Sequence, residues 1–161
     1  MSMNVGQMQL QKRLVDYKNS PITEGILDSQ YLQLLGLQDE SNPNLVVEVA
    51  SLFFTDAEQL LNDLSRELTQ QNVDFQQVDV HVDRLEGQSP SIGAPRLKNA
   101  CIAFRHFRNT CQETNIPVYL RCLENMRQEF LLVKSKLETL FNLEQQIAAA
   151  GGTIPIGRPH L

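Results

Sequence analysis

The sequence has no tryptophan, only 8 glycines among its 161 residues, and no excess of positive charge. No apolar run approaches the roughly 20 residues that a transmembrane helix needs, and the polar N-terminus does not resemble a secretory signal peptide. Lys and Arg number 14 against 19 Asp and Glu, which gives a net charge of -5. These counts provide no basic surface for nucleic acid or for an anionic membrane.

The sequence also lacks the patterns that usually carry catalysis. It contains no Gly-rich phosphate loop, no metal-ligand spacing and no nucleophile–base pair that can be placed together. We therefore expect a protein that is not an enzyme, with no cofactor and no metal, which works by docking onto another protein.

Cysteine is scarce and odd in number, with Cys101, Cys111 and Cys122 as the only three. An odd count without an export signal predicts reduced thiols and a cytoplasmic and nuclear location. A structural zinc site would need a fourth ligand and closer pairing. Cys101 falls in the apolar pattern of its segment, where cysteine behaves as a small hydrophobic residue.

Helical periodicity dominates the chain, and no alternating pattern predicts a strand. Asp28 and Asp74 are predicted N-caps, Ser41 or Asn42 is expected to cap a third helix, and Pro95 suits a first helical turn. Breaks at Gly, Pro, Asn and Ser divide the sequence into six predicted helices, at about residues 4–19, 25–37, 43–70, 74–89, 95–111 and 117–149.

Four strong helices with short connections, preceded by two weaker ones, predict an all-α fold. The expected architecture is an antiparallel four-helix bundle with two additional N-terminal helices. We expect residues 1–150 to form a single domain, residues 151–161 to form a flexible C-terminal tail, and the protein to be a monomer.

The segment HVDRLEGQSPSIGAPRLKNAC, residues 81–101, resembles the most characteristic region of plant histidine-containing phosphotransfer proteins. In that family, a histidine on an exposed bundle helix is followed by Gln-Leu-Lys-Gly-Ser-Ser, a Ser-Ile-Gly-Ala loop and an Arg-x-x-Asn-x-Cys helix. The matching residues here are Leu85, Gly87, Ser89, the loop 91–94, Arg96, Asn99 and Cys101. Residues 27–64 and the C-terminal LFNLEQQIAAAG are also similar, so that about 130 residues are covered.

The sequence departs from the family at the reactive position. Aligned on Leu85 and Gly87, the phospho-accepting histidine should stand at position 83, where this chain has Asp83. The family glutamine is replaced by Arg84 and the family lysine by Glu86. The resemblance thus implies a histidine-phosphotransfer-like domain that has no catalytic residue.

These substitutions remove the chemistry of phosphate acceptance. A neutral imidazole is a nucleophile, and the lysine three residues later lies on the same helix face and can neutralise phosphoryl charge. An aspartate would need an acidic, Mg²⁺-binding pocket to form an acyl phosphate. Asp79, Asp83 and Glu86 are expected to share one acidic ridge. The predicted partner-binding residues are Asp79, Asp83, Arg84, Glu86, Gly87, Ser89 and Pro90.

Three functions follow from the resemblance and its failure at position 83. The leading hypothesis is a pseudo-phosphotransfer protein that binds receiver domains of hybrid histidine kinases and response regulators without accepting phosphate, dampening a cytokinin-type two-component phosphorelay. A second is a helical interaction module for a partner without a receiver domain, since acidic receivers would be repelled by an acidic ridge. The third is active phosphotransfer through another histidine. His81 is disfavoured because it lies about 200° around the helix from position 83.

Overall fold

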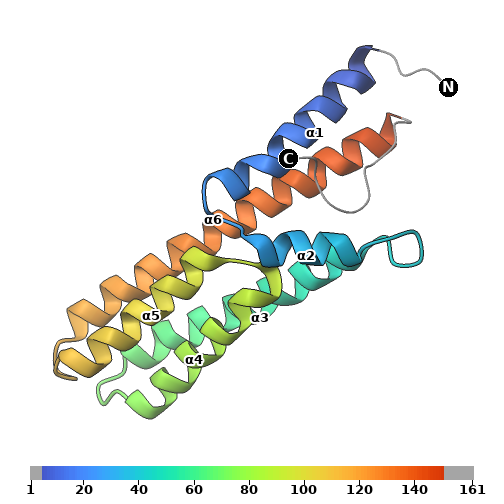
Figure 1. Ribbon diagram of the computed structural model, residues 1–161. Coiled ribbons are helices and arrows are strands. Elements are labelled where there is room, and N and C mark those ends of the chain that lie inside the picture. The colour runs from blue at the N-terminus through green and yellow to red at the C-terminus, as the bar shows by residue number, and fades with distance from the viewer. Residues whose placement is uncertain (1–4, 151–161) are drawn as a thin grey trace.

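Six helices make up most of residues 5–150, the part of the chain that this computed structural model describes (Figure 1). They are α1 (Val5–Thr23), α2 (Ser29–Leu37), α3 (Leu45–Leu68), α4 (Phe75–Ile92), α5 (Pro95–Thr110) and α6 (Ile116–Ala149). No strand occurs in this range, so the all-α prediction is confirmed. None of the six helices combines the length and the apolar character that crossing a bilayer requires.

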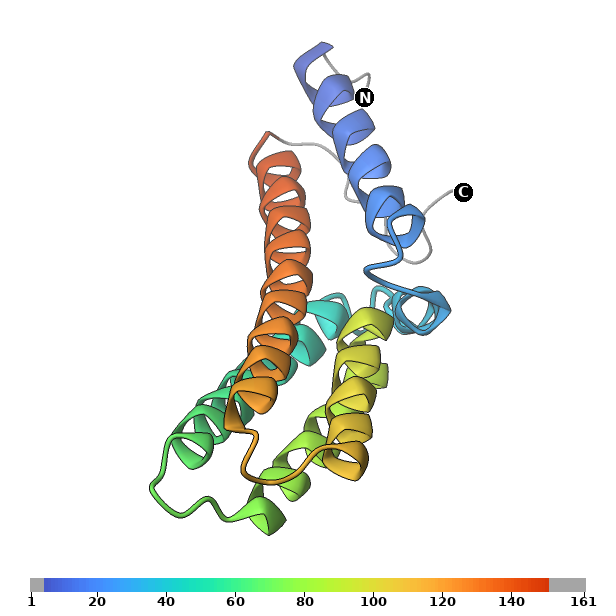
Figure 2. The same ribbon diagram turned by 90° about the vertical axis from the view of Figure 1, so that its left-hand side faces the viewer.

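Helices α3, α4, α5 and α6 form an up-and-down antiparallel bundle (Figures 1 and 2). Helix α6 is longer than its partners and continues past the bundle, where α1 packs along its C-terminal half. Helix α2 lies across the end of the bundle against α3 and α4. The predicted four-helix bundle with two added N-terminal helices is therefore confirmed. Residues 151–161, predicted to be a flexible tail, lie outside the described residues.

One continuous apolar core runs through all six helices. Leu64 of α3, Val82 of α4 and Phe104 of α5 are completely buried, as is Met126 of α6. Cys101 belongs to the same core, and its burial raises the pKa of its thiol to about 12, so it acts as the small hydrophobic residue that was predicted. Cys111 is only half-buried, because it follows the last residue of α5.

Local signals set several helix ends where the sequence predicted them. The carboxylate of Asp74 accepts hydrogen bonds from the backbone N–H groups of Gln76 and Gln77 at the start of α4. Asp28 does the same for Gln30 in α2. Pro95 occupies the first turn of α5, where the missing N–H of proline costs no helical hydrogen bond.

Three predicted boundaries are wrong for identifiable reasons. The first predicted helix ended at residue 19, before the proline, but α1 continues through Pro21 to Thr23. After the helix ends, the Pro21 carbonyl accepts hydrogen bonds from the N–H groups of Ile26 and Leu27. Helix α3 begins at Leu45, with its Val46 N–H capped by the side chain of Gln38, 3.0 Å away, and not by a cap at residues 41–42.

Helix α4 is the third case, since it passes Pro90 and ends at Ile92. Proline disrupts a helix because it lacks an N–H donor and its ring crowds the preceding turn, but only two helical residues follow Pro90 before α4 ends. The first two residues of the predicted loop at 91–94 thus belong to α4, which is closed by Gly93 in the left-handed conformation with a φ of 71°.

Gly93, at the end of α4, packs closely against the start of α2. Its carbonyl accepts a hydrogen bond of 3.0 Å from the N–H of Asp28. A Cβ atom at position 93 would lie 2.5 Å from the backbone nitrogen of Tyr31 and 2.6 Å from the Asp28 carboxylate. Only glycine fits both the backbone conformation and the space.

We expect Gly93→Ala to lower the free energy of unfolding by about 3 kcal/mol, combining left-handed strain of about 1–2 kcal/mol with displacement of α2. Urea denaturation followed by circular dichroism measures this. Gly25→Ala is the matched control, because Gly25 also has a positive φ, 75°, but open space around it. Its loss should be only the strain of about 1 kcal/mol, and equal losses for the two variants would contradict the close contact with α2.

Candidate functional site

The exposed face of α4 carries the residues that the sequence singled out. Its buried side chains recur three or four residues apart, with Val78, Val82 and Leu85 completely buried. This inward stripe turns Asp83 and Gly87 to the outer surface, where both are exposed. The position at which an active relative would carry its histidine is therefore accessible to a partner.

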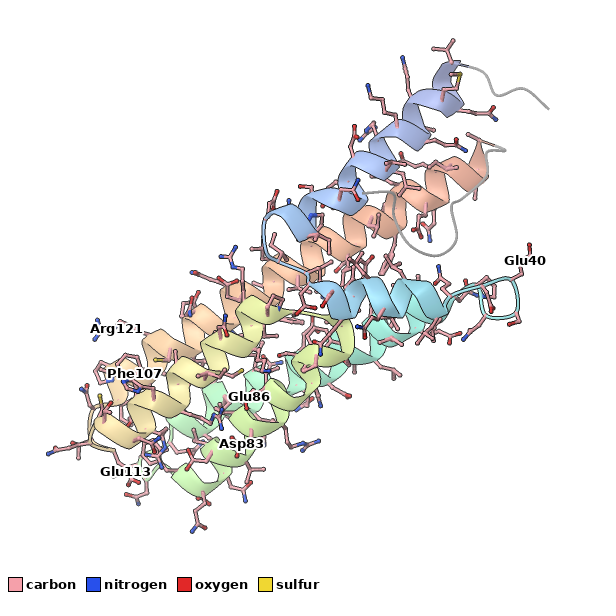
Figure 3. The ribbon with its side chains drawn as sticks, in the orientation of Figure 1. Glu40, Asp83, Glu86, Phe107, Glu113 and Arg121 are labelled. Carbon is pink, nitrogen blue, oxygen red and sulfur yellow. The ribbon has the colours of Figure 1, made fainter. Side chains whose placement is uncertain are left out.

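Asp83 borders a shallow groove between α4 and α5 (Figure 3). Within the described residues, its carboxylate makes no side-chain hydrogen bond and no ion pair. The same part of the chain holds no group of three His, Cys, Asp or Glu side chains placed to bind a metal ion. The groove is lined by Asp79, Asp83, Ile102, Arg105, His106, Arg108 and Asn109.

The other two acidic side chains of this face are neutralised from α5. The Arg108 guanidinium donates two hydrogen bonds to the Asp79 carboxylate, at 2.7 and 3.0 Å. One turn away, Arg105 donates to Glu86 at 2.5 Å. The predicted acidic ridge is therefore wrong as a statement of charge, because two of its three carboxylates are paired and only Asp83 is not.

The two ion pairs differ in their surroundings. The side chain of Arg108 is only 15% exposed, and its guanidinium lies 4.4 Å from the centre of the Phe75 ring. The hydrogen bond to Asp79 raises the pKa of Arg108 above its ordinary value. Arg105 is 46% exposed and has no aromatic neighbour among the contacts of the described residues. Arg108 is thus a fixed structural cation, whereas Arg105 is a surface one.

Sequence reasoning missed both arginines, although a signal exists for one of them, Arg108. Helices α4 and α5 are antiparallel and are joined at Gly93 and Ala94, so residues at similar distances from the joint lie on neighbouring turns. Asp79 lies 14 residues before Gly93, and Arg108 lies 14 residues after Ala94. Counting outward from the joint would have predicted this pair.

His81 lies on a different side of α4, as the helical angle predicted. Its Nδ1 is 3.1 Å from a carboxylate oxygen of Glu67 on α3, and its side chain is 14% exposed. It is therefore held between α3 and α4 and does not share the surface of Asp83. His106 of α5 is exposed and borders the groove.

The remaining predicted contact residues divide into exposed and buried ones. Arg84 and Gly87 are exposed, and no atom of residues 5–150 outside the local helix lies within 4 Å of a Cβ built on Gly87. Pro90 is half-buried beside a second depression that also includes Lys98 and Ile102. Ser89 is a correction, because it is 0% exposed and its hydroxyl donates to the Leu85 carbonyl at 3.0 Å. It cannot contact a partner from that position.

Comparison with known proteins agrees with this architecture. The Hpt domain matches residues 48–150. The chain belongs to the Hpt domain family. Proteins of this family mediate phosphotransfer in plant phosphorelays and interact with receiver domains of histidine kinases and response regulators.

Relatives of two kinds are similar to this Hpt protein. Histidine-containing phosphotransfer protein 1 of Arabidopsis thaliana is 57% identical, over 92% of this chain and 94% of the relative. Pseudo histidine-containing phosphotransfer protein 6 of Arabidopsis thaliana is 41% identical, over 83% and 86% respectively. The crystal structure of a histidine-containing phosphotransfer protein from Medicago truncatula superposes with a TM-score of 0.80 at 42% identity, covering 89% of this chain and 96% of that one.

We expect Arg108→Lys to lower the free energy of unfolding by about 1–2 kcal/mol, because lysine loses both the two-pronged carboxylate contact and the stacking on Phe75. Arg105→Lys is the matched control and should cost less than about 0.5 kcal/mol, as exposed pairs usually do. Urea unfolding curves of the two variants measure the difference, and equal costs would show that Arg108 is no more structural than Arg105.

Proposed function

We propose that this protein binds receiver domains without accepting their phosphoryl group and thereby dampens a cytokinin-type phosphorelay. The single observation that carries the proposal is the residue at the centre of the exposed face of α4. An Hpt scaffold presents Asp83 to solvent at the position where the family pattern has a histidine. Such a protein would occupy receivers and leave the phosphoryl group where it is.

The surroundings of position 83 support the lack of phosphate acceptance. In productive transfer, the P–O bond to the receiver aspartate breaks as a P–N bond to imidazole forms. On α4, the one imidazole is that of His81, which faces Glu67 on α3. Transfer to the Asp83 carboxylate would merely exchange one acyl phosphate for another, without the cation that such a phosphate requires.

The paired charges support docking onto an acidic partner. Three carboxylates, from Asp79, Asp83 and Glu86, would by themselves repel the acidic site of a receiver. Arg105 and Arg108 neutralise two of them. Gly87 leaves open space beside Asp83 for the approach of a partner backbone. The objection that favoured a partner without a receiver domain is therefore weakened.

We expect the purified protein to bind a ³²P-phosphorylated receiver domain and to take up no label. Asp83→His should gain measurable uptake, and the double variant Asp83→His, Glu86→Lys should gain more, because lysine adds charge that stabilises the phosphoryl group. An active Hpt protein with its histidine intact is the positive control. Binding is measured in parallel by calorimetry.

Uptake by the unaltered protein that disappears in His81→Ala or His106→Ala would overturn the proposal in favour of active phosphotransfer. Absence of binding to any receiver, with the fold intact by circular dichroism, would overturn it in favour of a different partner. The Asp83→His variant should bind the receiver as the unaltered protein does. This result would show that residue 83 determines transfer and is not required for docking.

We further expect Gly87→Ala to stabilise the fold and weaken docking at the same time. Replacing an exposed glycine within a helix by alanine gains about 0.5–1 kcal/mol, and nothing in the described part of the chain obstructs the new methyl group. That methyl group would, however, stand between α4 and a closely approaching receiver. A higher unfolding midpoint in urea with a several-fold weaker Kd is the expected result. An unchanged Kd would exclude close approach at Gly87.

A further inference from the structure

The face that borders the α4–α5 groove is nearly neutral, but its charges are not equally available to a partner. Asp79 and Glu86 are each bound to an arginine of α5. Asp83 lies between them, exposed and without a partner among the described residues. A docked protein would therefore meet the unpaired Asp83 carboxylate at the centre of the face, and on either side two arginines that are already paired with carboxylates of this protein.

The two arginines cannot easily be redirected to a partner. Arg108 is held by two hydrogen bonds to Asp79 and by the Phe75 ring. Arg105 is more exposed, yet turning it outward would leave the Glu86 carboxylate, only 18% exposed, without its cation. Recruiting Arg105 thus exchanges one unpaired carboxylate for another and gains no net positive charge.

The remaining charged and polar groups near the groove do not reverse this balance. Arg84 shares its side of α4 with His81, three residues earlier, and therefore lies toward α3 and away from the groove. Lys98 belongs to the neighbouring depression beside Pro90. His106 and Asn109 line the groove itself and offer hydrogen bonds to a partner.

We infer that this face discriminates between the two states of a receiver and binds the unphosphorylated form more tightly than the phosphorylated form. The inference rests on the proposed function, since it presumes that receivers dock here. Phosphorylation converts the receiver carboxylate, with one negative charge, into an acyl phosphate with about two at neutral pH, and the added charge would face the Asp83 carboxylate at close range. An unphosphorylated receiver lacks that added repulsion.

State selection would place the inhibition at a particular point of the relay. The protein would occupy receivers before they are loaded and would release them once they carry phosphate. It would act by blocking access of active Hpt proteins to resting receivers, and it would not store or protect the phosphorylated form.

The test is a calorimetric titration of the full-length protein with one receiver domain in Mg²⁺, with and without beryllofluoride, which mimics the aspartyl phosphate. We expect binding to the beryllofluoride form to be weaker by roughly fivefold or more, the effect of one close like-charge contact in a solvated site. Asp83→Asn should bring the ratio of the two Kd values close to 1. Glu86→Gln frees Arg105 and should therefore strengthen binding of the beryllofluoride form relative to the unmodified form.

Each remaining outcome has a distinct meaning. Equal Kd values for the two forms, or tighter binding of the beryllofluoride form by the unaltered protein, would overturn the inference and leave the proposed function standing. Failure to bind either form would overturn the proposed function and the inference with it. A preference that persists unchanged in Asp83→Asn would show that the selection does not come from Asp83. Unchanged urea midpoints confirm that the variants are folded.

Discussion

The register of α4 within the bundle is the constraint on which the surface of this protein depends. Phe75, Val78, Val82, Leu85 and Ile92 face the core, and no rotation of the helix could bury them and also bury Asp83. The same register turns His81 to α3 and Asp79 to α5. The inward stripe also carries Ser89, which matches the family pattern and serves as structural support here.

The contact between α4 and α5 then determines how much charge this surface shows. Two carboxylates of α4 form ion pairs with two guanidinium groups of α5. The groups that hold the two helices together are therefore the same groups that reduce the negative charge of this face. The pair formed by Asp79 and Arg108 is also supported by Phe75, which couples it to the core. A replacement at Asp79 would therefore change the packing of α4 as well as its surface, whereas a replacement at Asp83 would change the surface alone.

Most of the fold followed from local sequence, while the parts that depend on neighbouring helices did not. Asp74, Asp28 and Pro95 act within one helical turn, so their effects could be predicted from the sequence. The side chain of Gln38 caps a helix eight residues away through a turn built on Asp39, and no short motif announces it. The charge of the exposed face of α4 was mispredicted for the same reason, because a single-helix view of α4 does not include the arginines that α5 supplies.

Position 83 makes the separation of fold from chemistry possible in this protein. Its side chain contributes no described contact to the core, no helix cap and no ion pair, so a histidine can be replaced there without a cost in packing. The exposed face of α4 is retained because Gly87 and the α4–α5 pairs are held by the register of the helices and not by residue 83. Under the proposed function, a change at this one outward position alters what happens after docking, and which state of a partner is preferred, while the bundle that presents it stays the same.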